Sequence, residues 1–341
     1  MPATIKDVAQ RAGVSVATVS RVLNRLDVVS DSTRRRVNEA AANLGYIPHG
    51  GARSLSMRRT QCVGAVLPDL HGEFFSELIR GIDRSARLRN LHLLLTCSHD
   101  DSEELADALR AMQGRADGVL VMSPHIDAAM LEGNLPRSMP VVLMNTAREG
   151  TPYSSFVVDN HGGAARMVRH LHALGHRRIA MIAGPEGNHD ADERLRGYAE
   201  TLKSLAPAAK PQILRGDFTE ESGNRAGREL AAAARRPDAV FAANDAMAMG
   251  CFFALSEAGI RVPDDVALAG FDDIPIARYL TPPLTTVRVN IAELGELAFE
   301  RLALAIERGE RDKPSRKTLR TELVVRRSCG SQAGNQRGKR Q

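Results

Sequence analysis

The sequence lacks long apolar stretches and closely spaced cysteines. No run approaches the roughly 18 consecutive apolar residues of a membrane span, and the opening segment MPATIKDV has no apolar leader region. We therefore expect a cytoplasmic protein that does not contact a membrane. The four cysteines lie far apart without a CxxC pair, which excludes a disulfide framework and a zinc ribbon; they are Cys62, Cys97, Cys251 and Cys329.

Signatures of catalysis and of phosphate binding are also missing. The motifs GxxxxGK[ST], HExxH and GxSxG do not occur, and no nucleophile is paired with a nearby base. The histidines of HLHALGH, at 170, 172 and 176, suggest a metal site, but positions i and i+2 of a helix point apart and Gly175 ends the helix. We expect a solvated helix end there, and neither an enzyme, nor a cofactor, nor a bound metal.

Positive charge is concentrated at the amino terminus. The chain carries a formal net charge of +5, whereas residues 1–60 alone hold ten lysines and arginines against four acids, which gives +6. The remaining residues therefore sum to about −1. A basic head on a near-neutral body favours a polyanionic partner for the head. A solvated basic surface is the alternative.

Three short helices are predicted in this basic segment. Thr4 caps a first helix that Gly13 ends, Ser15 caps a second helix in the stretch SVATVSRVLN, and Ser30 precedes a third that stops at Gly45. Two helices joined by a glycine-containing turn form a helix-turn-helix. The 341-residue length leaves room for one or two further domains.

The second helix has an unusually flat outer face. Its exposed positions carry short side chains and one guanidinium, which lets its axis approach base edges in a major groove about 12 Å wide. We expect Arg21 to contact guanine, Val16 or Ala17 to touch a thymine methyl, and Thr18 and Ser20 to bind phosphates. A small helical protein-interaction domain is the alternative.

The segments IKDVAQRAGVSVATVSRVLN and TRRRVNEAAANLGYIP closely resemble the DNA-binding headpiece of the LacI/GalR family of bacterial transcription regulators, over residues 4–48. The resemblance implies that Val16 and Ala17 choose the operator sequence, and this pair is most similar to that of galactose-repressor-like members. The DNA-binding residues that it implies are Thr4, Ser15, Val16, Ala17, Thr18, Ser20, Arg21, Asn24, Tyr46, His49, Ala52, Arg53 and Leu55.

Residues 48–60 correspond to the hinge of that family. Pro48 prevents the third helix from continuing, and Ala52, Arg53 and Leu55 match a hinge helix that, by resemblance, folds on operator binding and inserts a leucine into the minor groove. This chain departs from the family at His49-Gly50-Gly51. Two glycines cost a helix roughly 1 kcal/mol each. We expect a hinge that folds reluctantly. A flexible linker is the alternative.

Apolar strands alternate with amphipathic helices after residue 60. This repetition predicts two doubly wound α/β sheets. The expected strands are 62–67, 91–95, 118–122, 140–144, 156–159, 179–184, 212–216, 239–244 and 266–271, and the expected helices are 74–89, 102–114, 126–133, 160–174, 191–205, 219–235 and 245–258.

The resemblance divides the chain into four parts. These are an all-α helix-turn-helix headpiece (1–47), the hinge (48–60), an effector-binding and dimerisation core of two α/β subdomains (61–328), and a disordered basic tail (329–341). The core is similar to periplasmic binding proteins, and its chain is expected to cross between subdomains near 157–160, 286–290 and 315–322. The tail QAGNQRGKRQ lacks the leucine heptads of tetrameric members, so a homodimer is expected.

Polar and aromatic residues follow several of the expected strands. Ligands of α/β sheets bind beyond the carboxyl ends of the strands, and these positions also match effector positions of the family. Phe75 and Phe218 can sandwich a ligand, while hydrogen bonds come from Asn145, Arg194, Asn244 and Asp272, together with Asp245.

This mixture of side chains suits a sugar or polyol, whereas a purine, the known alternative in the family, would depend more on stacking. The alternative role of Asn244 and Asp273 is to start a helix. Asp159 is expected to be a helix N-cap and not a ligand.

The expected function is ligand-gated binding to double-stranded DNA. Two headpieces of a homodimer would bind a near-palindromic operator, and a small sugar-like effector in the core would modulate that binding. The favoured interpretation is a repressor of a carbohydrate-utilisation operon. The alternatives are a purine- or other metabolite-responsive regulator, acting by co-repression or activation, and a transport-type ligand-binding protein.

Overall fold

The computed structural model describes residues 3–23, 29–47, 59–123, 126–146, 151–208, 210–309 and 314–331. The chain forms two compact units, Met1–Cys62 with Gly114–Asp117, and Val63–Gln113 with Gly118–Gln341. Several positions expected to contact DNA lie outside the described residues, namely Asn24, His49, Ala52, Arg53 and Leu55. No helix in the described ranges is long and apolar enough to cross a membrane.

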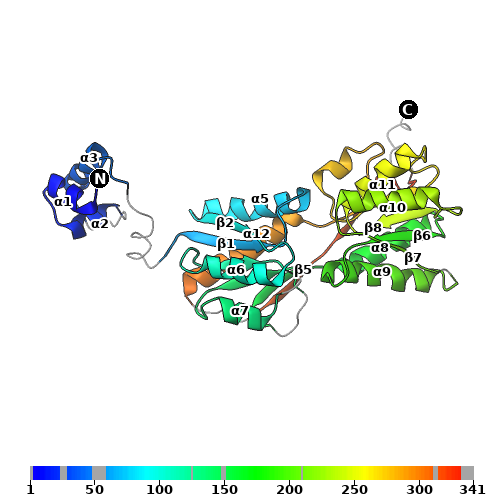
Figure 1. The fold of residues 1–341 in the computed structure, drawn as a ribbon, viewed down its shortest axis with the longest axis horizontal. Coiled ribbons are helices and arrows are strands. Elements are labelled where there is room, and N and C mark those ends of the chain that lie inside the picture. Colours follow the sequence, from blue (N-terminus) through cyan, green and yellow to red (C-terminus); the bar gives the residue numbers. More distant parts are fainter. Residues whose placement is uncertain are drawn as a thin grey trace, which may run out of the picture. The chain divides into compact units, whose positions relative to one another are not determined.

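The described part of the first unit contains three helices, α1 (Ile5–Ala12), α2 (Val16–Leu23) and α3 (Asp31–Asn43), as the sequence predicts (Figure 1). Thr4 and Asp7 form a capping box at the start of α1, and Gly13 ends this helix in the left-handed conformation with φ +62°. Ser30 occupies the N-cap position of α3 without a side-chain capping bond. The helices bury a small core of Val8, Ala9, Ala12, Val19, Val22, Val37, Ala40 and Ala41.

The second unit contains a six-stranded sheet of order β11-β5-β4-β3-β1-β2. Helices α5 and α12 pack together on one face, and α6 and α7 cover the other (Figure 1). The strands are β1 (Cys62–Leu67), β2 (His92–Cys97), β3 (Val119–Val121), β4 (Val141–Met144), β5 (Ser154–Val158) and β11 (Arg316–Leu319), and the helices are α5 (Glu73–Leu88), α6 (Ser102–Met112), α7 (Ala128–Asn134) and α12 (Ile291–Arg308).

A four-stranded parallel sheet of order β7-β6-β8-β9 follows in the same unit. Its central strands are apolar at every position because helices cover both faces, with α8 and α9 on one side and α10 and α11 on the other (Figure 1). The strands are β6 (Ile179–Ala183), β7 (Gln212–Arg215), β8 (Ala239–Ala242) and β9 (Ala267–Ala269), and the helices are α8 (Asn160–Ala173), α9 (His189–Leu205), α10 (Glu220–Ala232) and α11 (Asp245–Glu257).

The predicted strands and helices of both sheets are confirmed, with ends that shift by a few residues. Helix α12, the edge strand β11 and the short 3-10 helix η1 (Pro275–Arg278) were not among the elements that the sequence predicted.

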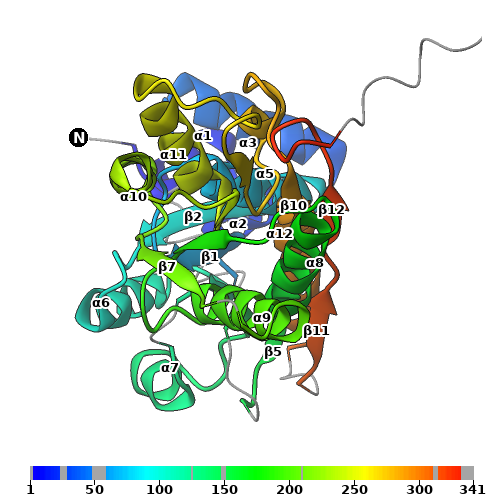
Figure 2. The same cartoon turned by 90° about the vertical axis from the view of Figure 1, so that its right-hand side faces the viewer.

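Three chain segments join the two sheets. The chain passes from β5 into α8, from β10 (Thr286–Arg288) into α12, and from β11 into β12 (Glu322–Val324). Strands β10 and β12 pair antiparallel and lie side by side in Figure 2. Two of the three connections are therefore hydrogen-bonded to each other.

Helices α10 and α11 are in backbone contact at two glycines. A Cβ atom at Gly250 would lie 1.8 Å from the carbonyl oxygen of Glu220, and one at Gly223 would lie 2.1 Å from that of Met247. Side chains at either glycine would force the two backbones apart. This contact positions the first turns of both helices, where several of the predicted ligand residues lie.

We expect Gly250→Ala to lower the free energy of unfolding by about 2–3 kcal/mol, because the helices can relieve the clash only by separating. Gly133 in α7 provides the control, since a Cβ atom there meets nothing within 4 Å. Gly133→Ala should stabilise the chain by about 0.5–1 kcal/mol. Urea denaturation of both variants measures the difference, and equal stabilities would contradict the packing argument.

Candidate functional site

Helix α2 presents the outward face that the sequence predicts. The Oγ atom of Ser15 accepts a hydrogen bond from the Thr18 backbone N–H at 3.1 Å and caps the helix. Val19 and Val22 are buried among the other helices of the first unit, which leaves Val16, 41% exposed, on the outer side. Ala17 and Arg21 are also exposed, and Thr18 and Ser20 are half-buried. This face can therefore offer a guanidinium and small apolar groups to a groove.

The other described DNA-binding candidates have structural contacts as well. The Thr4 hydroxyl donates to Asp7 Oδ2 at 2.7 Å within the capping box. The pKa of Asp7 is lowered by these hydrogen bonds from Thr4. Tyr46 is half-buried and packs against the helix core. Their roles in DNA binding remain predictions.

A cavity of about 450 Å³ lies in the second unit. Residues that follow strands of both sheets line it, as expected for ligands that bind beyond the carboxyl ends of parallel strands. The six effector candidates from the sequence all lie in its wall: Phe75, Asn145, Arg194, Phe218, Asn244 and Asp272. The structure thus brings together residues separated by almost two hundred positions.

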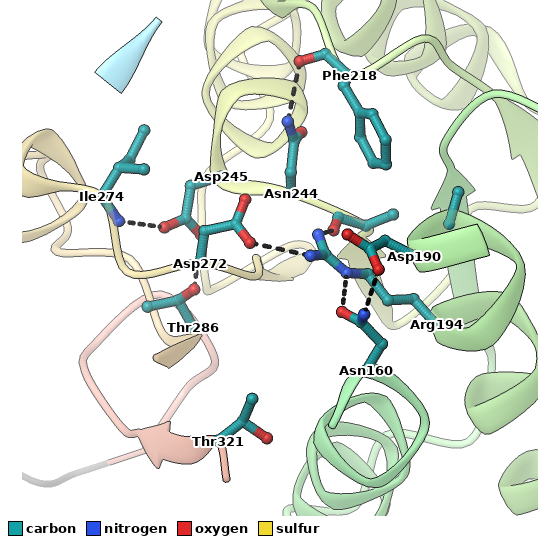
Figure 3. A network of polar contacts seen from close by, with 12 residues as sticks. Asn160, Asp190, Arg194, Phe218, Asn244, Asp245, Asp272, Ile274, Thr286 and Thr321 are labelled. Atoms are coloured by element: carbon teal, nitrogen blue, oxygen red, sulfur yellow. Dashed lines mark hydrogen bonds and ion pairs between the residues drawn. The ribbon is translucent and has the colours of Figure 1, made fainter. Parts of the chain in front are cut away.

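Arg194 is the centre of the polar network at this cavity (Figure 3). The guanidinium donates from Nε to Asn160 Oδ1 at 2.8 Å and from Nη1 to the Ala243 carbonyl at 2.6 Å. Its Nη2 lies 3.1 Å from Asp272 Oδ1. The guanidinium also stacks at 3.9 Å on the ring of Phe271. The side chain is 3% exposed, so the protein itself fixes its position.

Two carboxyl groups share this single guanidinium. Burial raises the pKa of Asp272 to about 7; the charge of Arg194 opposes this shift, and nearby Asp190 reinforces it. Desolvation likewise raises the pKa of Asp190, whose side chain accepts a hydrogen bond from Asn160 at 2.8 Å. Ionisation of either carboxyl group in the unliganded cavity therefore costs desolvation free energy.

The pH dependence of stability tests this assignment. An acid whose folded pKa is raised from 3.8 to about 7 contributes stability that is fully present below 3.8 and lost as pH rises to about 7. Between about pH 5 and about pH 7.5, the unfolding free energy of the unliganded wild type should fall by about 2 kcal/mol more than that of Asp272→Asn. Denaturation curves of both proteins provide the measurement. Parallel pH profiles would show that Asp272 titrates normally.

Three of the six candidates have strained backbones. Asn145, Phe218 and Asp272 have φ angles of +48°, +71° and +108°, in the region that non-glycine residues rarely occupy. Such strain gathers at ligand sites, where the surrounding fold holds a side chain in a fixed direction.

The structure corrects the expected role of Asp245. Its side chain is fully buried away from the cavity, where it accepts hydrogen bonds from Thr286 Oγ1 at 2.6 Å and from the Ile274 N–H at 2.9 Å (Figure 3). Desolvation raises the pKa of Asp245 well above its ordinary value. Asp245 therefore connects α11 to β10 and does not hydrogen-bond a ligand in the cavity, contrary to what the sequence predicts.

Asn244 borders the cavity but has two structural contacts. Its Oδ1 caps α11 by accepting from the Met247 N–H at 2.9 Å, and its Nδ2 donates to the Phe218 carbonyl at 2.9 Å. Asn244 thus begins a helix, the alternative that the sequence left open, and also holds the loop that carries Phe218. Asp159 is the N-cap of α8, as predicted.

Two smaller expectations are wrong. Asp273 does not start a helix; its carboxylate accepts from Arg288 at 2.7 Å and from Arg326 at 2.6 Å. The histidines at the end of α8 are not simply solvated, because His176 Nε2 lies 3.1 Å from the Cys329 carbonyl and His170 Nε2 lies 3.5 Å from its sulfur. Among the described residues, no group of His, Cys, Asp and Glu is arranged to hold a metal ion.

Asp190 and Asn160 are the polar residues of this network that the sequence reasoning missed. One signal was available, since Asp190 precedes Arg194 by four positions and therefore lies on the same face of α9. Nothing local indicated Asn160, whose contact with Arg194 joins α8 to α9.

Comparison with known proteins gives matches over nearly the whole chain. Residues 4–49 match the family of bacterial regulatory proteins called lacI, and residues 168–329 match a periplasmic binding protein-like domain. The HTH-type transcriptional repressor PurR of Proteus mirabilis is 37% identical over 333 residues, covering 96% of both chains. The PurR of Shigella dysenteriae is 37% identical over 332 residues, again covering 96% of both.

Solved structures are similar over the same extent. The lac repressor dimer bound to operator and the anti-inducer ONPF has a TM-score of 0.85 at 29% identity, covering 96% of this chain and 99% of that one. A complex of the transcriptional regulator CelR with cellobiose has a TM-score of 0.69 at 35% identity, with the same coverage.

Proposed function

Because this chain belongs to the LacI family of bacterial regulatory proteins and is a DNA-binding transcriptional repressor, we propose that it controls a carbohydrate-utilisation operon. A homodimer binds a near-palindromic operator through α2 of each headpiece. A small sugar-like effector in the core cavity modulates that binding. Phosphate contacts supply much of the affinity, which should therefore fall steeply with salt.

The composition of the cavity wall is the observation that carries the sugar assignment. Phe75 and Phe218 offer apolar faces to the C–H groups of a ring, while Asn145, Arg194 and Asp272 place amide, guanidinium and carboxyl groups around the same space. Alternating apolar faces and polar edges are what a pyranose or furanose presents. The cellobiose complex of CelR, 35% identical to this chain, supports the same class.

A purine effector is the second candidate. It is favoured by the relatives named PurR, at 37% identity. Phe74 and Phe75 form an edge-to-face pair with ring centroids 5.3 Å apart at the cavity wall, which could accept a flat base. Stacking on these aromatic side chains would then contribute more to affinity than the hydrogen bonds from Asn145, Arg194 and Asp272.

Two measurements on the full-length chain test the proposal. Selection from random duplexes by gel shift should recover a near-palindrome, and a monomer that ignores duplex sequence at low salt would overturn the regulator assignment. Thermal-shift screening against sugars, sugar acids and nucleobases should raise the melting temperature most with a sugar. Stabilisation by nucleobases alone would favour the purine candidate.

The mechanism requires two conformations of the core with different ligand affinities. A ligand that binds one conformation more tightly shifts the population toward it, and only that difference in affinity can alter operator binding. Such a change of conformation must involve the three chain segments that connect the two sheets. In this proposal the homodimer carries the change to the two hinges.

A further inference from the structure

Helix N-termini surround the cavity. Helices α5, α9, α10 and α11 all begin at residues of the cavity wall or directly beside them. Such termini ordinarily attract anions, because each presents unpaired N–H groups and about half a positive charge. Taken alone, this arrangement would indicate a phosphorylated or carboxylated ligand.

Side chains of the protein itself already occupy these termini. Each of the four helices has an acidic residue in its first turn, and three have side-chain caps that already accept bonds from the first N–H groups. The acids are Glu73, Asp190, Glu220 and Asp245, and the caps are Asn188, Thr219 and Asn244. The first N–H groups of α9, α10 and α11 are therefore already hydrogen-bonded within the protein before a ligand binds.

The cavity wall as a whole is strongly acidic. Seven carboxyl groups line it, against one guanidinium, that of Arg194, and two imidazoles, those of His71 and His189. The carboxyl groups are those of Asp69, Glu73, Asp100, Asp190, Asp217, Glu220 and Asp272. Each of the three Arg194 nitrogens already has a partner within the protein, in Asn160, Ala243 and Asp272. The guanidinium is thus not held ready for a negatively charged ligand.

Buried acceptors without donors give an independent indication. Among the residues that the structure describes, Asn145 Oδ1 is a buried oxygen that accepts no hydrogen bond, and Asp272 Oδ1 has only its ion pair with Arg194. Both side chains line the cavity and are 8% and 4% exposed. Buried acceptors are normally satisfied, so a ligand that fits here must bring donors. Ionised phosphate and carboxylate groups bring none.

We propose that the cavity selects an uncharged or positively charged ligand whose hydroxyl or amine groups donate to Asn145, Asp190 and Asp272, and that it rejects the phosphorylated or carboxylated form of the same compound. This inference rests on the proposed function, because it takes this cavity as the effector site. It narrows the effector to compounds without a negative charge, such as free sugars, polyols, amino sugars and free nucleobases. Sugar phosphates, uronic acids and nucleotides are excluded.

The experiment measures binding of matched compounds to the full-length chain by isothermal titration calorimetry. The galactose, glucose and ribose skeletons are each compared as the neutral sugar, the phosphate and, for the hexoses, the amine and the uronate. At about pH 8, where Asp272 with its pKa of about 7 is ionised, at least one neutral or amine form should bind. Its acidic counterparts should bind on the order of 100-fold more weakly, as expected for a negative charge added beside the carboxyl groups of the cavity wall. An acidic form that binds more tightly than its parent would overturn the inference.

A panel in which no neutral or amine form binds would also contradict it. Gel-shift selection on the same preparation shows whether such a result contradicts only the ligand selectivity or also the proposed regulator function. Recovery of a palindrome together with tight binding of a sugar phosphate would leave the regulator intact and refute only the selectivity. Failure to select any duplex would instead refute the regulator.

Asp190→Asn tests whether the carboxyl groups are responsible. Removing one charge at the cavity floor should reduce the discrimination against the acidic forms by about tenfold, while circular dichroism verifies folding. Asp192→Asn is the matched control, since Asp192 lies on the same helix with an exposed side chain. Unchanged discrimination in Asp190→Asn, or an equal loss in Asp192→Asn, would show that these carboxyl groups do not select the ligand.

Discussion

Replacing Arg21 with alanine is expected to abolish the sequence preference of the proposed homodimer while leaving effector binding intact. Arg21 is exposed on the outer face of α2, where its guanidinium can make two hydrogen bonds to guanine. Such a contact discriminates between bases by about 1–3 kcal/mol. Because a dimer makes it in both half-sites, the operator affinity should fall by roughly 30-fold to 10⁴-fold, whereas non-specific binding should change little.

Arg36→Ala provides the control for this prediction. Arg36 is an exposed arginine of α3 in the same unit, so its removal lowers the charge of the headpiece equally without altering the recognition face. Gel shifts of both variants on the selected operator and on a scrambled duplex, at several salt concentrations, separate the two effects. Retained preference in Arg21→Ala would place base recognition elsewhere in the headpiece.

Replacing Asp272 with alanine should leave operator binding intact but insensitive to ligand. Asp272 lies in the cavity wall with its carboxyl beside Arg194, and it belongs to a different unit from α2. A buried hydrogen-bonded charge that loses its partner costs about 2–5 kcal/mol of binding, so the effector affinity should fall by roughly 30-fold to several thousandfold. The measurement is the ligand concentration that changes a gel shift by half.

The alanine variant leaves a buried guanidinium with one partner fewer and therefore also loses stability. Asp272→Asn keeps the shape of the side chain and distinguishes lost charge from lost packing. If a folded Asp272→Ala protein still responds to the effector at the wild-type concentration, the cavity is not the effector site.

Local chemistry explains why so much of the architecture could be predicted. The capping box of Thr4, the left-handed Gly13 and the alternation of short apolar runs with amphipathic stretches are properties of neighbouring residues. They predict where elements begin, end and bury a face. The sequence did not predict the edge strand β11, because three of its four residues are exposed and it has no apolar run.

The ligand-site candidates were predicted because residues that follow parallel strands converge at one edge of a sheet. Asn145 follows a strand of one sheet, and Phe218 and Asp272 follow strands of the other. The resemblance to the family predicted that the two edges share one cavity, where the structure places all three residues. The rule itself acts within one sheet. It cannot say which way a side chain turns. Asp190 and Asp245 both lie in the first turn of a helix beside the cavity, yet only Asp190 belongs to its wall.

The sequence by itself determined the basic three-helix head, the two α/β sheets and the edge of the sheets where a ligand binds, because caps, periodicity and strand order act over a few residues at a time. The tertiary structure alone decided which groups meet: Asn160 with Arg194 across two helices, Asp245 with Thr286 away from the cavity, and two carboxyl groups beside one guanidinium. Burial and partnership depend on chain segments that are distant in sequence, and only packing brings those segments together.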